Sequence, residues 1–109
     1  MSLINGKDMQ PYNNDFFRKE EELVLSSARQ VVPIVMRLLN PRRVIDVGCG
    51  TGAWLSVFAE HGLDELVGID GAYIDPAALK IPRERFRTFD LRQPVRLNET
   101  FDLVLSLEV

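Results

Sequence analysis

"VIDVGCGTG", residues 44–52, is the most informative stretch of this chain, because a β-branched run passes directly into a loop with three glycines. Val44, Ile45 and Val47 suit a buried strand of a parallel sheet. Glycine accepts positive φ and has no Cβ, so the chain can turn sharply toward a helix and a ligand can approach the backbone. This loop predicts a nucleotide-like ligand, yet a carboxylate, Asp46, stands two residues before the first glycine.

Strand and helix signals alternate after this loop. The patterns predict a helix over 52–61, strands over 66–70, 86–89 and 101–107, and a helical turn over 76–79. Thr51 is a candidate cap for the first of these helices. A strand, a helix and a strand within about 30 residues form a βαβ unit. The predicted fold class is therefore α/β, with a doubly wound parallel sheet.

The part before the glycine loop is predicted to be helical and to carry no diagnostic motif. Apolar residues recur at helical spacing over 15–32, and Pro33 suits the first position of a second helix over 33–39. We therefore divide the chain into an N-terminal segment with helices, residues 1–41, and an α/β domain, residues 42–109.

Composition excludes several classes of function. The chain has 109 residues, 46% hydrophobic and 27% charged, and its net charge of -3 provides no overall attraction to nucleic acid or anionic lipid. One cysteine and one histidine exclude an intrachain disulfide and the usual zinc clusters, so no metal site is expected. No apolar run approaches the length of a membrane span and no secretory signal opens the chain, so we predict a cytoplasmic protein.

Asp46 discriminates between two ligands that fit a glycine loop. Gly48, Gly50 and Ala53 match the loose dinucleotide pattern G-x-G-x-x-G/A, which places a pyrophosphate at the helix N-terminus. Two like charges about 4 Å apart repel by roughly 4 kcal/mol at an effective dielectric near 20, so a phosphate beside Asp46 is disfavoured. A cationic ligand without phosphate, such as S-adenosylmethionine with its sulfonium and ammonium groups, is favoured.

Four segments together resemble the class I S-adenosylmethionine-dependent methyltransferases, whose fold is Rossmann-like. "VIDVGCGTG" is similar to the glycine motif of this family, and "LVGID", residues 66–70, to the acidic end of its second strand. "TFDL", residues 88–91, and "FDLVLSLEV", residues 101–109, resemble the ends of its third and fourth strands. The resemblance implies S-adenosyl-L-methionine as the cofactor.

The resemblance also implies a role for individual residues. The methionyl part of the cofactor is expected along Asp46 and the backbone of Gly48, Cys49, Gly50, Thr51 and Gly52. Asp70 is expected to accept hydrogen bonds from the two ribose hydroxyls, which agrees with the acceptor-only chemistry of a carboxylate. The adenine is expected between the segment from Gly71 to Tyr73 and the pair Asp90 and Leu91. Ser106 and Leu107 are expected to border the methionyl end and the substrate opening.

The expected catalytic residues are unknown, because the family has a seven-stranded sheet and four strands are visible here. We therefore predict the cofactor-binding half of a methyltransferase, with a small-molecule methyl acceptor and no nucleic-acid or membrane partner. The basic side chains of residues 80–96 are interpreted as a solvated face. Two alternatives stay open: an NAD(P)-binding domain of an oxidoreductase, and a truncated, non-catalytic module that self-associates through its fourth strand.

Overall fold

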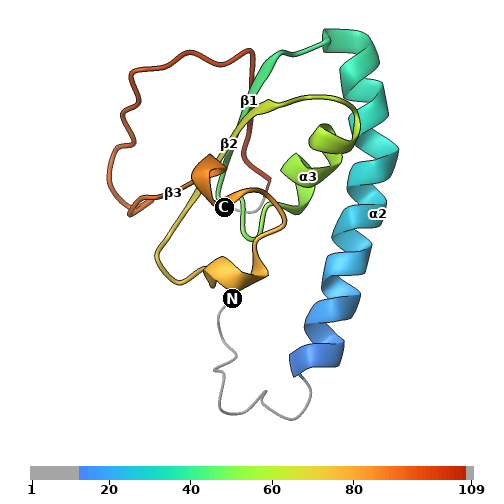
Figure 1. Cartoon of the computed structure of the whole chain (residues 1–109), viewed down its shortest axis with the longest axis vertical. Coiled ribbons are helices and arrows are strands. Elements are labelled where there is room, and N and C mark those ends of the chain that lie inside the picture. Colours follow the sequence, from blue (N-terminus) through green and yellow to red (C-terminus); the bar gives the residue numbers. More distant parts are fainter. Residues whose placement is uncertain (1–12, 108–109) are drawn as a thin grey trace.

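The computed structural model describes residues 13–107, which form helices and strands in alternation (Figure 1). In chain order the elements are α2 (Asn13–Leu39), β1 (Arg43–Val47), α3 (Ala53–Glu60), β2 (Glu65–Asp70), the 3₁₀ turns η1 (Pro76–Ala78) and η2 (Arg83–Arg85), β3 (Phe86–Thr88) and β4 (Leu103–Leu105). This order confirms the predicted strand–helix–strand unit around the glycine loop, and β3 and β4 follow one another with no helix between them.

The four strands form one parallel sheet in the order β3-β2-β1-β4. The chain moves outward from β1 to β2 and β3, then returns to place β4 on the other side of β1. The carboxyl ends of all four strands therefore meet at one edge, and the order reverses beside β1. Ligands of open α/β sheets bind at such a reversal, so this edge is where a site is expected. The predicted Rossmann-like α/β class is confirmed.

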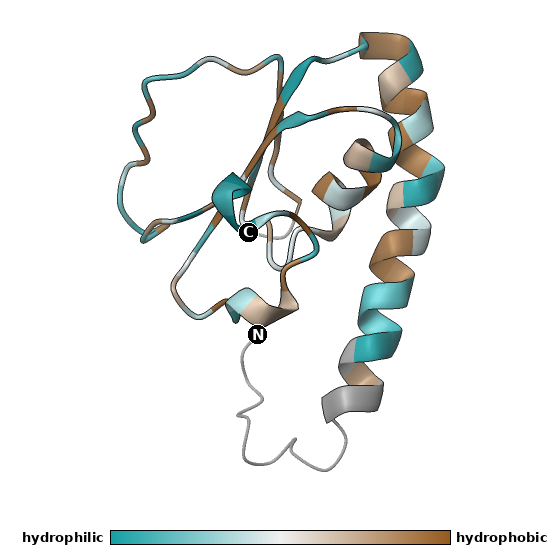
Figure 2. Ribbon diagram, viewed as in Figure 1, coloured by the Kyte–Doolittle hydropathy of each residue, from teal (hydrophilic) through white to brown (hydrophobic). Residues whose placement is uncertain are grey.

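Helices α2 and α3 cover one face of the sheet, with α3 lying between α2 and the strands (Figure 1). The core on this face joins residues from both helices and the sheet, and its largest fully buried members include Phe58, Leu55, Val32 and Val44. Figure 2 shows the apolar colouring of the central strands that this packing requires. The N-terminal helix thus shares one core with the glycine-loop unit.

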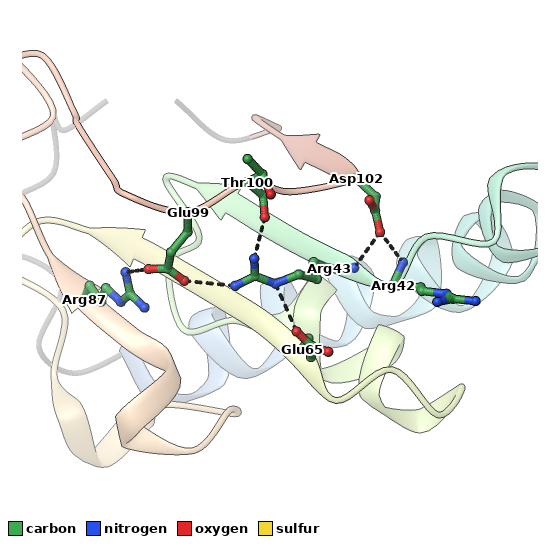
Figure 3. Close-up of polar contacts among 7 residues, drawn as sticks. All are labelled: Arg42, Arg43, Glu65, Arg87, Glu99, Thr100 and Asp102. Atoms are coloured by element: carbon green, nitrogen blue, oxygen red, sulfur yellow. Dashed lines mark hydrogen bonds and ion pairs between the residues drawn. The ribbon is translucent and has the colours of Figure 1, made fainter.

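The opposite face of the sheet is covered by the connection between β3 and β4, residues 89–102, which has no helix of its own (Figure 1). Its apolar side chains pack on Ile45, Val67 and Ile69. Arg43 also holds this connection: its guanidinium donates to the Thr100 carbonyl at 2.7 Å and pairs with Glu99 at 3.0 Å (Figure 3).

The prediction of two helices before the sheet is wrong. Residues 13–39 form one helix, α2, with Pro33 inside it. Proline removes one backbone hydrogen bond and destabilises a helix interior, but packing can outweigh that local penalty. Here Ala28 and Val32 are fully buried before the proline, and Val35 and Met36 pack on the same core after it. The apolar face therefore continues through Pro33.

The predicted last strand over 101–107 is shorter in the structure, where β4 comprises Leu103–Leu105. Among the described residues β4 forms an edge of the sheet, and Val104 is exposed. Self-association through this strand stays a prediction. Within residues 13–107, none of the helices combines the length and the apolar character that a bilayer crossing requires.

Candidate functional site

The glycine loop turns the chain from β1 into α3 at the carboxyl edge of the sheet. Gly50 and Gly52 have φ values of 59° and 89°, in the left-handed region that favours glycine. A Cβ at Gly52 would lie 3.0 Å from Ile81, whereas a Cβ at Gly50 would meet nothing within 4 Å. Gly52 is the N-cap residue of α3, so the expectation that Thr51 caps this helix is wrong. The backbone of Gly50 thus faces open space where a ligand can approach.

Asp70, at the end of β2, joins this loop to the neighbouring strands. Its side chain is almost fully buried, and its two carboxylate oxygens accept hydrogen bonds from the Gly50 amide at 2.8 Å and the Gly71 amide at 2.7 Å. The Asp70 carbonyl accepts a third from the Phe89 amide, just after β3, at 2.9 Å. The structure therefore joins three segments of the predicted cofactor site at Asp70, two through its carboxylate and one through its backbone carbonyl.

Tyr73 also reaches Asp70. Its hydroxyl donates a hydrogen bond to Asp70 Oδ1, and its ring lies over Gly71, where an added Cβ would overlap the ring. The hydrogen bond to Asp70 raises the pKa of Tyr73, which keeps the phenol protonated and donating at neutral pH. The sequence placed Tyr73 beside the adenine but did not predict its bond to Asp70.

Two cavities open on either side of Tyr73. The first, of about 590 Å³, lies between the segments that follow β2 and β3, and it is lined by Gly71, Ala72, Tyr73, Thr88, Phe89, Asp90, Leu91 and Arg92. The second, of about 570 Å³, lies between α2 and the glycine loop. Its lining includes Gly50, Thr51, Trp54 and Tyr73, together with Glu20 and Glu21 of α2.

Asp46 lies deeper than the loop that follows it. It is 2% exposed and stands in β1 opposite Gly68 of β2. Cys49 packs directly above Gly68, because a Cβ at Gly68 would lie 2.7 Å from Cys49 Sγ. Burial raises the pKa of Cys49 to about 12, and the charges of Asp46 and Asp70 add to this effect. Cys49 is therefore a neutral packing residue of the loop, and the two carboxylates make the loop electronegative.

The predicted adenine residues Asp90 and Leu91 both line the first cavity. Leu91 is half-buried against the apolar cluster on the second face of the sheet. Asp90 is exposed, and Arg92 donates to its two oxygens at 3.0 and 3.1 Å, which lowers the pKa of Asp90. Asp90 therefore stays ionised at neutral pH, and an ionised carboxylate can accept a hydrogen bond from an amino group.

Ser106 and Leu107 follow β4 at the same edge of the sheet, and both are exposed. They line neither of the two cavities beside Tyr73. Their expected place at the substrate opening stays a prediction.

Sequence reasoning missed the part of the site that α2 supplies. Glu20 and Glu21 line the second cavity, and Glu21 Oε1 lies 3.5 Å from Lys80 Nζ. The Lys80 amide in turn donates to the Thr51 carbonyl at 2.8 Å, which ties α2 to the glycine loop. No motif marks these glutamates, so their only sequence signal is the polar side of an amphipathic helix.

The chemistry of these groups suits a nucleoside that carries positive charge. The almost fully buried Asp70 carboxylate lines neither cavity, but its hydrogen-bond partners Gly71 and Gly50 line the first and the second cavity, and Tyr73 lines both. The Gly50 backbone is open, and acidic side chains lie beside the loop. A pyrophosphate would face the charges of Asp46 and Asp70, and the described loop residues bring no cationic side chain toward it. Among residues 13–107, no group of three or more His, Cys, Asp or Glu side chains is placed to hold a metal ion.

Comparison with known proteins identifies the family. Residues 18–109 match the methyltransferase domain family, so the chain belongs to it. The predicted class I S-adenosylmethionine-dependent methyltransferase domain is thereby confirmed, and S-adenosylmethionine follows as its cofactor. The dinucleotide alternative, which rested on Gly48, Gly50 and Ala53, is set aside.

Several proteins are similar over part of their length. The ribosomal RNA large subunit methyltransferase E of Caulobacter sp. (strain K31) is 44% identical over 36 residues, which are 33% of this chain and 16% of that protein. The protein of the same name from Hyphomonas neptunium is 39% identical over 67 residues, which are 59% of this chain and 29% of that protein. This chain thus spans less than a third of these relatives.

A solved structure also resembles this chain. It is an S-adenosylmethionine-bound amino pentose methyltransferase of calicheamicin biosynthesis from Micromonospora echinaspora, 29% identical, with a TM-score of 0.47. The match covers 98% of this chain and 44% of that one.

Proposed function

We propose that this chain binds S-adenosylmethionine at the carboxyl edge of its sheet and presents the methyl group for transfer to a small-molecule acceptor. The observation that carries the proposal is Asp70, an almost fully buried carboxylate between the glycine loop and the first cavity. In this arrangement Asp70 holds the ribose and the first cavity holds the adenine. The methionyl part then lies along residues 48–52.

The charge of the site supports this orientation. Asp46 and Asp70 lie close enough to Cys49 to raise its pKa, so the loop is negative where a sulfonium and an ammonium group would lie. The bound cofactor supplies an activated methyl group, and the protein residues hold it in place for in-line attack by the acceptor. Methyl transfer depends more on the alignment of the acceptor with the methyl group than on acid–base catalysis.

Replacing Asp70 tests the ribose contact. Asp70→Asn removes the charge and half of the acceptor capacity, so its dissociation constant for S-adenosylhomocysteine is expected to rise roughly 10- to 100-fold, as for hydrogen bonds to a charged group. Isothermal calorimetry measures this constant, and a thermal melt checks that the variant is folded.

Asp64→Asn is the matched control, because Asp64 is an exposed carboxylate just before the amino end of β2 and lines neither of the two cavities. The same change of charge lies at the opposite edge of the sheet there, so this variant should keep the affinity of the parent chain. Equal affinity of Asp70→Asn and the parent chain would remove Asp70 from the site.

A small acceptor is supported by the acidic wall of the second cavity. Glu20, Glu21 and Asp75 line this cavity beside the glycine loop, and such a wall repels a phosphate backbone. The acceptor proposed here is therefore a neutral or cationic small molecule that enters from the side of α2.

RNA is the second candidate acceptor, and the names of the similar proteins favour it. The methyltransferases from Caulobacter and Hyphomonas carry ribosomal RNA in their names, but they match this chain over 36 and 67 residues, which are 16% and 29% of their own length. An RNA acceptor would need a basic surface next to the site.

A further inference from the structure

Of the three groups that donate hydrogen bonds to the Asp70 carboxylate, the Tyr73 hydroxyl belongs to a side chain that can rotate. The Gly50 and Gly71 amides belong to the backbone, and the loop before Gly50 is anchored by bonds from the Gly48 and Cys49 amides to the Ile69 carbonyl. The Tyr73 side chain is 78% exposed, so it can rotate into solvent without opening the core.

The number of acceptor sites on Asp70 sets a limit. An ionised carboxylate offers about four lone-pair sites. Within residues 13–107, three donors occupy such sites on Asp70: the Gly50 amide, the Gly71 amide and the Tyr73 hydroxyl. A ribose with two free hydroxyls brings two more donors, which exceeds this capacity. One donor must leave, and the two amides are held by the backbone.

We propose that Tyr73 gates the cofactor site by competing with the ribose hydroxyls for Asp70, and that its side chain leaves Asp70 when the nucleoside enters. This inference rests on the ribose contact of the proposed function. Tyr73 lines both cavities, so the same rotation moves a side chain that borders each of them. The adenine cavity and the cavity beside α2 then become one continuous groove, as an elongated cofactor requires.

The ring position supports this role. The ring lies over Gly71, and Gly71 leaves room for it because a Cβ there would overlap the ring atoms. A residue with a side chain at position 71 would therefore push the ring away from Asp70. Glycine at this position allows Tyr73 to approach Asp70, and the exposure of the ring allows it to leave.

Tyr73→Phe tests the competition, because it removes the hydroxyl and keeps the ring. The variant is expected to bind adenosine roughly 3- to 10-fold more tightly than the parent chain, the fold-change of about one hydrogen bond. Binding of 2′,3′-dideoxyadenosine, which lacks the competing hydroxyls, should change less than about twofold by the same reasoning. Isothermal calorimetry on the 109-residue chain measures both constants.

Comparing adenosine with 2′,3′-dideoxyadenosine distinguishes competition for Asp70 from a general change in structure. A general change would alter the dissociation constants of both nucleosides alike. Equal or weaker adenosine binding by Tyr73→Phe would overturn the gate, and so would a gain that dideoxyadenosine shares. If the parent chain binds S-adenosylhomocysteine while the gate fails, the proposed function stands. If neither protein binds adenosine or S-adenosylhomocysteine, both the gate and the proposed site are overturned.

Discussion

Cys49 illustrates at the scale of one residue how the glycine loop is built onto the sheet. Its sulfur occupies the space that the missing side chain of Gly68 leaves on β2. This close packing buries the thiol, and two carboxylates beneath and beside the loop oppose its ionisation. Cys49, in the middle of the glycine loop, thus packs against the sheet, and the backbone of the neighbouring glycines is left accessible to a ligand.

The buried thiol of Cys49 is expected to be unreactive in the folded chain. With a pKa of about 12, roughly one thiol in ten thousand is ionised at pH 8, and the thiolate is the reactive form. Labelling with an aromatic disulfide reagent at pH 8 should therefore be slow in buffer and fast in denaturing urea. Labelling of the native chain as fast as that of the unfolded chain would contradict this assignment.

At the scale of elements, the connection from β3 to β4 is held by a charged network rather than by a helix. Glu99 bridges Arg43 of β1 and Arg87 of β3, and Asp102 accepts bonds from the Arg42 and Arg43 amides at 2.8 and 3.0 Å (Figure 3). The Arg43 guanidinium also lies 5.0 Å from the ring centre of Phe101. These contacts fasten the end of the segment that carries Asp90 and Leu91.

The Glu99 network predicts a specific dependence of stability on pH. The Arg87 and Arg43 guanidiniums lower the pKa of Glu99 below its ordinary value of 4.5. Because the pKa of Glu99 is lower in the folded chain than in the unfolded chain, its ionisation stabilises the fold at pH values above the unfolded-state pKa. This stabilisation is lost as the pH falls through the folded-state pKa. The stability difference between the parent chain and Glu99→Gln should therefore be largest near neutral pH and shrink below pH 4.5.

Urea unfolding at a series of pH values measures this difference. Glu22→Gln is the control, because Glu22 is an exposed carboxylate on α2, far in sequence from the network. A constant difference for Glu99→Gln between neutral and acidic pH would show that the bridge to Arg87 and Arg43 does not stabilise the connection.

At the scale of the whole molecule, ion pairs involve three of the six basic side chains of residues 80–96. Lys80 pairs with Glu21, Arg87 with Glu99, and Arg92 with Asp90. The chain as a whole has a net charge of -3. This distribution supports the interpretation of the segment as a solvated face, and it supports a small acceptor over RNA.

RNA binding by the chain is therefore expected to be weak. For a structured ribosomal RNA fragment in 150 mM salt, we expect a dissociation constant no tighter than the nonspecific range of about 10⁻⁴ to 10⁻⁶ M. Fluorescence anisotropy at several salt concentrations measures the constant and its salt dependence. Submicromolar binding with a steep loss of affinity at higher salt would favour RNA as the acceptor class.

The sequence by itself determined the strand, glycine loop and helix, the end of β2 at Asp70, and the family, because these features depend on local patterns of apolar, acidic and glycine residues. The tertiary structure decided what long-range packing controls. It joined the two predicted helices across Pro33, brought Glu20 and Glu21 beside the glycine loop, and linked Arg43 to Glu99 across 56 residues of sequence. It also formed the hydrogen bond from the Tyr73 hydroxyl to the Asp70 carboxylate. Local periodicity reports which side of an element is buried, whereas only the packed fold determines which element lies against that side.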